Sequence, residues 1–222
     1  MTGAAGRIGR MLRPYLPEIS PGWRLTDRER APGVEPLDLT DAAAVARACR
    51  GVAAIVHLGG ISAEASFEEV LDANVRGTEH VLRGAAEAGV PRVVIASSNH
   101  ATGRHDQRSL PDDAPPRPDS FYGWSKAAVE SLARLYHDEH GLDVVCLRIG
   151  HCLEKPADVR DLSVWLSPAD AARLIAASLT ATGYHLVWGV SANTRRWWPT
   201  TGGEAIGYHP RDDAEVFAPH LT

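Results

Sequence analysis

The chain has 222 residues, of which 44% are hydrophobic and 23% are charged, and its formal net charge is -5 at pH 7. This length favours one sizeable core over two independent ones. The acidic balance and the scattered arginines give no basic surface for a nucleic acid, and no apolar run approaches the roughly 20 residues that span a bilayer. The first residues lack a signal-peptide pattern, and the three cysteines lack C-x-x-C spacing. We therefore expect a cytoplasmic protein with reduced thiols and without a metal, nucleic-acid or membrane partner.

Helices and strands alternate along the chain. Apolar residues at helical spacing predict helices over residues 6–16, 41–51, 67–89, 122–141, 167–182 and 211–217. Runs rich in Val, Ile and Leu predict strands over residues 22–27, 52–60, 92–98, 143–150 and 184–191. Asp41 and Ser167 are predicted helix caps, and Pro17 is predicted to lie just beyond the end of the first helix.

Continuous apolar strands separated by helices of ten or more residues imply a parallel sheet with both faces covered. We therefore predict an α/β fold with a doubly wound parallel sheet, in a single domain over residues 1–222. Two long stretches, 99–121 and 151–166, are rich in Pro, Asp and Arg and exceed the length of ordinary turns. Loops of that length in a compact domain are often functional.

The chain opens with the motif T-G-x-x-G-x-x-G, whose glycines are Gly3, Gly6 and Gly9. Such glycines permit a tight turn and a close approach of the backbone to a pyrophosphate, which the following helix N-terminus attracts. Asp27 ends the next predicted strand, at the distance expected for a carboxylate that binds an adenosine ribose hydroxyl. A carboxylate there repels a 2′-phosphate, so NAD is favoured over NADP, and the neighbouring Arg28 softens that preference.

The segment "YGWSK" places Tyr122 and Lys126 four residues apart, on one face of a predicted helix. An ammonium group beside a phenol favours the phenolate, so Lys126 is expected to lower the pKa of Tyr122. Tyr122 is then a candidate base that accepts a hydroxyl proton while a hydride leaves the same carbon. Ser97, Ser98 and Asn99 end a predicted parallel strand, where open α/β sheets place their ligands.

Seven segments together resemble the extended short-chain dehydrogenase/reductase family, and within it the uronate dehydrogenases. They are "TGAAGRIG", "HLGGIS", "ASSNH", "YGWSK", "RIGHC", "LSVWLS" and "VWGVSAN", in the same order over almost the whole chain. The resemblance implies a Rossmann-like fold with a small C-terminal substrate-binding lobe, formed mainly by residues 151–166 and 184–222. It also implies NAD-dependent oxidation of a hexuronic acid, such as glucuronate or galacturonate, at the anomeric carbon to an aldaric acid lactone. Relatives tend to self-associate, so a homo-oligomer is a further expectation.

The resemblance assigns roles to individual residues. The implied catalytic residues are Tyr122, Lys126, Ser98 and Asn99. The implied cofactor-binding residues are Gly3, Gly6, Arg7, Ile8, Gly9, Asp27, Asp38, Leu39, Leu58, Gly59, Gly60, Asn74, Tyr122 and Lys126. The implied substrate-binding residues are Ser62, Ser98, Asn99, His100, Tyr122, His151 and Arg160. Among these, Arg160 matches the family's substrate arginine, whose forked guanidinium suits a carboxylate.

The chain departs from the family at three places. His151 stands where the family usually has a serine that contacts substrate, and an imidazole is larger and titrates near neutral pH. Met1 stands at the valine of the family's "VTGAAG", so the first, central strand of the sheet is expected to be missing, and a start site assigned too late is the simplest hypothesis. The tail is also shorter than usual.

Two other functions stay open from the sequence. A nucleotide-sugar epimerase or dehydratase uses the same glycine and Tyr/Lys residues, although only 96 residues follow Lys126 to enclose a nucleotide-linked sugar. A catalytically degenerate Rossmann protein that binds or regulates is the alternative that is not an enzyme.

Overall fold

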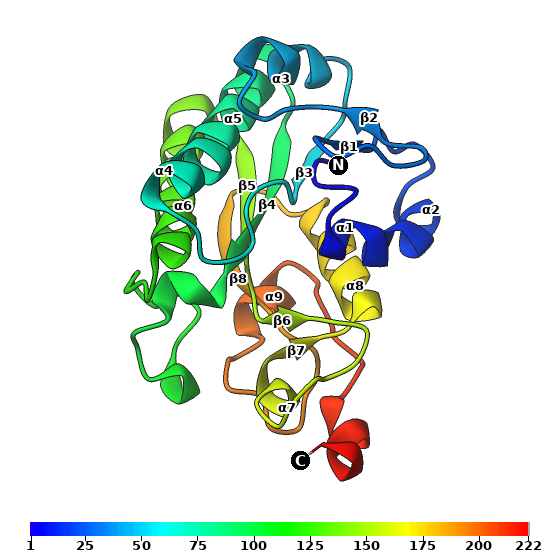
Figure 1. Ribbon diagram of the computed structural model, residues 1–222, viewed down its shortest axis with the longest axis vertical. Coiled ribbons are helices and arrows are strands. Elements are labelled where there is room, and N and C mark those ends of the chain that lie inside the picture. The colour runs from blue at the N-terminus through cyan, green and yellow to red at the C-terminus, as the bar shows by residue number, and fades with distance from the viewer. Residues whose placement is uncertain (222) are drawn as a thin grey trace.

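The computed structural model describes residues 1–221, without the side chain of Ser109, and centres on a parallel sheet (Figure 1). Its four main strands are hydrogen-bonded in the order β3-β4-β5-β8. They are β3 (Ile55–His57), β4 (Arg92–Ser98), β5 (Asp143–Ile149) and β8 (Tyr184–Gly189). A second parallel pair consists of β1 (Thr26–Asp27) and β2 (Glu35–Pro36).

Thr2 joins the two groups of strands, because it forms parallel bridges to Thr26 of β1 and to His57 of β3. The Thr2 amide donates to the Val56 carbonyl at 3.0 Å, and the Thr26 amide donates to the Met1 carbonyl at 2.9 Å. No strand is assigned to the described residues before β1, but Met1 and Thr2 occupy the central position between β1 and β3. The strand order reverses at Thr2, which makes this the switch point where doubly wound sheets bind ligands.

Helices cover both faces of the sheet (Figure 1). One face carries α1 (Arg7–Leu12), η1 (Arg13–Tyr15), α2 (Leu16–Ile19) and α8 (Pro168–Ser178). The other face carries α3 (Ala42–Ala48), α4 (Phe67–Val70), the π-helical η2 (Leu71–Arg76), α5 (Gly77–Ala88) and α6 (Phe121–His140). Each face has its own buried apolar cluster, with Leu12 and Leu174 in one and Val81 and Val129 in the other. Burying such a side chain contributes roughly 1.5–3 kcal/mol. The predicted doubly wound α/β fold is confirmed.

The predicted helix caps are also confirmed. Asp41 Oδ1 accepts the Ala44 amide at 2.9 Å, and Ser167 Oγ accepts the Asp170 amide at 2.9 Å. Several boundaries differ from the prediction. Pro17 lies inside α2, because a proline in the first turn of a helix lacks only an amide that has no helical partner. Only two residues of the predicted strand 22–27 pair, and the predicted helix 211–217 is the 3₁₀ segment η5 (Ala214–His220).

The C-terminal segments gather below the sheet in the view of Figure 1. They include β6 (His151–Cys152), α7 (Asp161–Val164), β7 (Trp165–Leu166), α9 (Thr201–Ala205) and η5. The rings of Trp188 and Trp198 stack with their centres 4.5 Å apart, and Phe217 meets Trp165 edge to face. The contacts among these tryptophans and Phe217 fix the position of the segments that border the carboxyl end of the sheet. The loop after β4 carries two further short helices, η3 (Asn99–Thr102) and η4 (Gln107–Ser109).

Three structural features bear on the sequence-based expectations. The three cysteines, Cys49, Cys146 and Cys152, are all buried and unpaired. No helix within residues 1–221 has the length and apolar content to cross a bilayer. The same residues contain no group of three or more His, Cys, Asp or Glu side chains arranged to hold a metal ion.

Candidate active site

The glycine loop turns tightly between Thr2 and α1. Gly3 has a φ of +69°, and a Cβ atom at this position would lie 2.6 Å from the Gly59 nitrogen. The backbone of the loop thus touches the backbone after β3, and only a glycine fits there. The first turn of α1 follows, with Arg7, Ile8 and Gly9 presenting amides that have no helical partner. The loop leaves room for a pyrophosphate against main-chain N–H groups.

A cavity of about 380 Å³ lies over this loop. Most of the predicted cofactor residues line it, and the exceptions are Asn74, Tyr122 and Lys126. Those in the lining are Gly3, Gly6, Arg7, Ile8, Gly9, Asp27, Asp38, Leu39, Leu58, Gly59 and Gly60. Asp27 Oδ2 accepts the Ala5 amide at 2.9 Å and Oδ1 accepts the Glu29 amide at 3.0 Å. These two bonds orient the carboxylate and leave further lone pairs for a ribose hydroxyl. The backbone cradle and the acidic strand end fit a dinucleotide such as NAD.

Asn74 is the remaining predicted cofactor residue outside α6. It is almost fully buried, and its amide group is engaged by the protein itself. Asn74 Oδ1 accepts the Ile61 amide at 2.7 Å, while Nδ2 donates to the Ile61 carbonyl and to Ser125 Oγ. Asn74 therefore fixes the wall formed by Gly60 and Ile61, and direct contact with a cofactor stays a prediction.

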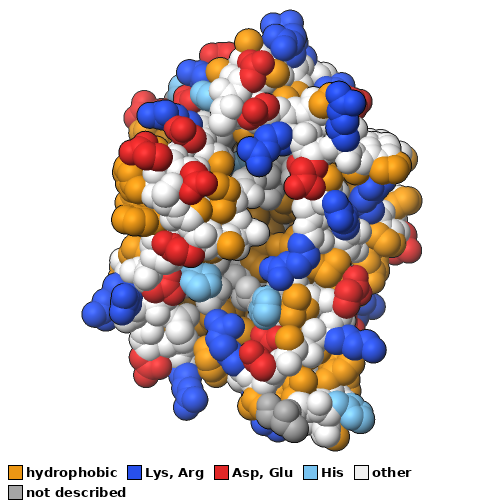
Figure 2. Space-filling model, in the orientation of Figure 1, with side chains coloured by type: hydrophobic (Ala, Val, Ile, Leu, Met, Phe, Trp, Pro, Cys, Tyr) orange, Lys and Arg blue, Asp and Glu red, His pale blue; other side chains and the backbone are white. Residues whose placement is uncertain are grey.

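A second cavity, of about 240 Å³, continues from the first toward the C-terminal segments. The two share six lining residues, which are Arg7, Ile8, Leu58, Gly60, Ile61 and Ser62. The second cavity is also lined by Ser98, Asn99, His100, Tyr122, Lys126, His151 and Arg160. The fold thus brings every predicted catalytic and substrate residue to one place. Figure 2 shows the hollow in the molecular surface, with arginine or lysine and histidine side chains beside it.

The charged side chains that line this second cavity are all basic. Its lining contains Arg7, Lys126 and Arg160 and two histidines, but no aspartate or glutamate. Lys126 is buried, whereas Arg7 and Arg160 are exposed at the rim. The Arg160 guanidinium carbon lies 5.8 Å from the ring centre of Trp197, which steadies the loop that carries it. Such a lining favours an anionic ligand.

Tyr122 and Lys126 lie in the first two turns of α6, whose N-terminus is capped by Ser120. Lys126 Nζ donates to the Ala96 carbonyl at 2.8 Å, and burial lowers the pKa of Lys126 to about 8. Burial is also the largest influence on Tyr122 and raises the pKa of its phenol above 10.0, although a hydrogen bond with Ser98 and the charge of Arg7 act in the opposite direction. The expected net lowering of the Tyr122 pKa is therefore wrong, because desolvation by burial outweighs the nearby charge.

The end of β4 supplies the polar groups opposite Tyr122. Ser98 Oγ accepts the His100 amide at 3.2 Å, which begins the turn η3, and Asn99 is buried beside it. Ser97 also lines the second cavity, but its hydroxyl donates to Glu130 Oε1 at 2.6 Å. A direct contact of Ser97 with a ligand stays a prediction.

Glu130 and Arg148 form a buried ion pair beneath the site that the sequence analysis did not identify. Their side chains are 4% and 1% exposed, and Arg148 Nη2 lies 2.7 Å from Glu130 Oε2. The pair joins α6 to β5, and Arg148 Nη1 also donates to the Ala114 carbonyl in the long loop after β4. The spacing of the two residues in the sequence does not predict an ion pair, because they meet only when the helix packs on the strand.

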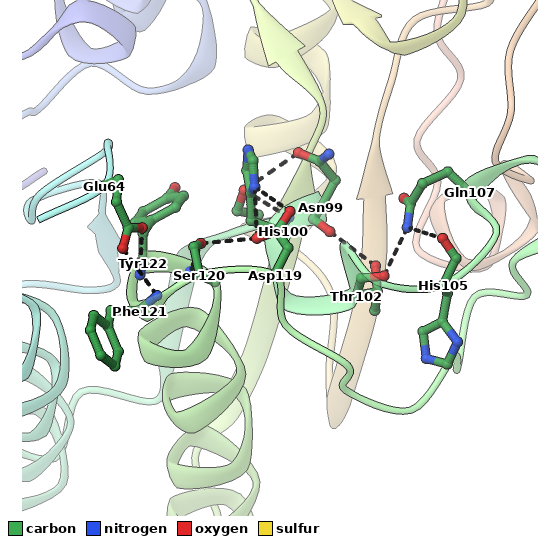
Figure 3. Close-up of polar contacts among 12 residues, drawn as sticks. Glu64, Asn99, His100, Thr102, His105, Gln107, Asp119, Ser120, Phe121 and Tyr122 are labelled. Atoms are coloured by element: carbon green, nitrogen blue, oxygen red, sulfur yellow. Dashed lines mark hydrogen bonds and ion pairs between the residues drawn. The ribbon is translucent and has the colours of Figure 1, made fainter. Parts of the chain in front are cut away.

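Two more unexpected contacts surround Tyr122 (Figure 3). Glu64, from the loop after β3, accepts the backbone amides of Phe121 and Tyr122, both at 3.3 Å. His100 Nδ1 is hydrogen-bonded to Asp119 Oδ2 at 2.9 Å, and its ring packs edge to face on Tyr122 with centres 5.6 Å apart. Both contacts tie a loop to the start of α6.

Comparison with known proteins agrees with this geometry. The model of the NAD dependent epimerase/dehydratase family matches residues 1–154. The chain belongs to this family. Within it, the chain is 42% identical over 227 residues to a uronate dehydrogenase of Pseudomonas syringae pv. tomato, an alignment that covers 98% of this chain and 82% of that relative.

Solved structures place the chain in the same part of the family. The crystal structure of uronate dehydrogenase from Agrobacterium tumefaciens matches with a TM-score of 0.94 and 41% identity, over 99% of this chain and 86% of that one. A variant of the Agrobacterium enzyme complexed with NAD matches with a TM-score of 0.94 and 40% identity, over the same shares. The predicted Rossmann-like fold is confirmed by these matches.

Proposed function

We propose that the chain is an NAD-dependent uronate dehydrogenase, which oxidises glucuronate or galacturonate at the anomeric carbon to an aldaric acid lactone. The observation that carries the proposal is the second cavity, where the Tyr122 hydroxyl and the polar end of β4 share a small space with Arg160 and no acidic side chain. A cyclic uronate has two matching chemical features. Its anomeric hydroxyl must lose a proton, and its carboxylate needs a cation.

In this proposal different residues of the chain bind the substrate and accept its proton. Ser98 and Asn99 hold the anomeric hydroxyl. Tyr122 first loses its own proton to solvent, and the phenolate oxygen Oη then accepts the hydroxyl proton as the carbon–hydrogen bond breaks. NAD, when bound, accepts the hydride from that carbon. The electrons of the broken O–H bond form the carbonyl of the lactone, so the reaction yields one lactone, one reduced dinucleotide and one proton. Lys126 anchors the start of α6 to β4 and would hold the nicotinamide ribose of NAD.

The carboxylate end of the substrate faces the C-terminal segments. Arg160 supplies a forked guanidinium for it, and Ser62 reaches the sugar from the loop after β3. In this proposal residues 151–166 and 184–222 form the substrate lobe of a single domain. A cytoplasmic location and a homo-oligomer stay predictions.

NADH formation from glucuronate and galacturonate tests the proposal, with glucose 6-phosphate and glucose as anionic and neutral controls. We expect turnover of a uronate well above that of both controls. Turnover of the sugar phosphate alone would contradict the uronate assignment. Binding of UDP or dTDP with no uronate turnover would favour a nucleotide-sugar enzyme, and tight NAD binding with no sugar turned over would favour the binding protein.

A further inference from the structure

His151 and Asp161 form a dyad at the wall of the second cavity. His151 Nδ1 and Asp161 Oδ1 are 2.8 Å apart, and Asp161 is completely buried whereas the His151 side chain is 33% exposed. The second carboxylate oxygen, Oδ2, accepts the Ala157 amide at 2.8 Å. The carboxylate therefore holds the imidazole by one ring nitrogen and is itself held in place by the backbone.

A buried carboxylate needs compensation for its lost hydration. Within residues 1–221, the ion pairs give Asp161 a single basic partner, which is His151. The neighbouring Arg160 does not neutralise it, because its guanidinium is turned onto Trp197. Asp161 thus favours the form of His151 that carries a proton on Nδ1.

The other ring nitrogen, Nε2, has no hydrogen-bond partner among the described residues, and His151 lines the second cavity. The charged and titratable groups that line the same cavity are Arg7 from α1, Arg160 before α7, His100 from η3, and Tyr122 and Lys126 from α6. None of them is a carboxylate that would hold a proton on Nε2. A uronate would be the first acidic group on that side, and its arrival would place the imidazole between two carboxylates.

We propose that His151 is a specificity-determining residue that takes up a proton when the uronate binds, and that Asp161 is the positioning residue that makes this possible. This inference rests on the proposed function. The proton comes from solvent and goes onto Nε2, which then donates a charge-assisted hydrogen bond to an oxygen of the substrate carboxylate. No bond of the sugar is made or broken in this step.

Calorimetry of uronate binding tests the proposal directly. The Tyr122→Phe variant is loaded with NADH, which leaves no hydride acceptor and so excludes turnover. The heat is compared in two buffers of different ionisation enthalpy at about pH 8, where an imidazole free in water is largely neutral. We expect a net uptake of up to about one proton per uronate. His151→Gln in the same background should remove most of the uptake, and the remainder reports Lys126, whose pKa of about 8 is shared by both proteins. Asp161→Asn should reduce the uptake to the same remainder, while thermal unfolding shows that both variants are folded.

Steady-state kinetics supply the second readout. In the otherwise unchanged enzyme, His151→Gln should raise KM for the uronate about 10- to 100-fold, the range for a hydrogen bond between charged groups, with a smaller change in kcat. His185→Gln is the matched control, because His185 bonds only to the Thr182 carbonyl away from the cavity.

The outcomes separate the two proposals. If the unsubstituted enzyme oxidises a uronate but binding takes up no proton, or if His151→Gln leaves both KM and the uptake unchanged, the dyad proposal is wrong and the proposed function stands. If the unsubstituted enzyme oxidises no uronate, the proposed function fails and the dyad proposal fails with it.

Discussion

The Lys126 ammonium lies 5.8 Å from the centre of the Tyr122 ring, but it donates its hydrogen bond to the Ala96 carbonyl of β4. The lysine therefore joins the catalytic turn of α6 to the strand whose end carries Ser98. In the protein without ligand, burial of the phenol rather than this ammonium dominates its acidity. Correct placement of the phenol and its readiness to accept a proton are thus two separate properties of the site.

Replacing Tyr122 by Phe should remove the proton acceptor and little else. We expect kcat to fall about 10²- to 10⁴-fold, the usual contribution of a general base. NAD affinity, measured by fluorescence titration, should change less than about tenfold, because the lost hydroxyl contributes at most one hydrogen bond to the complex. Substantial remaining turnover would exclude Tyr122 as the base.

Acid should destabilise the fold through His57. This side chain is buried between the hydroxyls of Thr2 and Thr78, and burial lowers the pKa of His57 from 6.5 to about 3. The unfolded chain binds a proton below pH 6.5 that the folded chain rejects, so this contribution to stability is complete above pH 6.5 and is lost as the pH falls toward 3.

The corresponding measurement is urea unfolding between pH 4 and 7. The folded-to-unfolded ratio should fall about tenfold per pH unit below 6.5 through this one group. His57→Gln removes the titrating ring, so its free energy of unfolding should depend less steeply on pH. Parallel pH profiles for the two proteins would show that His57 does not carry the effect.

Asp27 should control the choice between NAD and NADP. Asp27→Asn keeps the shape of the side chain but removes the charge that repels a 2′-phosphate. We expect NAD to bind about 10-fold more weakly, the effect of one hydrogen bond to a charged group, and the preference for NAD over NADP to shrink. Cofactor titrations of both proteins measure this, and an unchanged preference would assign the selectivity to another residue, with Arg28 the next to test.

Glu64 should position the loop that carries Ser62. Its carboxylate accepts both backbone amides at the start of α6, so Glu64→Ala frees the loop from Tyr122. We expect KM for the uronate to rise about 3- to 10-fold, which corresponds to one or two ordinary hydrogen bonds. Glu68→Ala is the control, since Glu68 is exposed on α4. Equal effects of the two changes would point to a general loss of negative charge.

Arg160 should discriminate carboxylates from neutral groups. Arg160→Met should lower kcat/KM for the uronate about 10- to 100-fold, and Arg160→Lys should lower it less, because lysine keeps the charge but not the fork. Arg196→Met, exposed in the same part of the chain, should have no such effect. A lysine variant as impaired as the methionine variant would mean that the fork, and not the charge alone, is required.

Much of the fold followed from local pattern. The apolar runs of β4 and β5, the cap at Asp41 and the left-handed Gly141 after α6 are set by residues near one another in the sequence, so a linear reading finds them. The short strands β1 and β3 were overestimated, because a strand's length depends on how many partners the neighbouring backbone offers. At the switch point those partners are Met1 and Thr2.

The sequence by itself determined which chemical groups are available: a glycine turn, an acidic strand end, a tyrosine and lysine one helical turn apart, and an arginine in a late loop. Only the tertiary structure decided which of them act together and in what state. It bonded the Ser97 hydroxyl to Glu130, paired His151 with a carboxylate ten residues away, and placed Glu64 against Tyr122. The physical reason is that burial and hydrogen bonding depend on groups from distant segments, and these set both the direction of a side chain and its affinity for a proton.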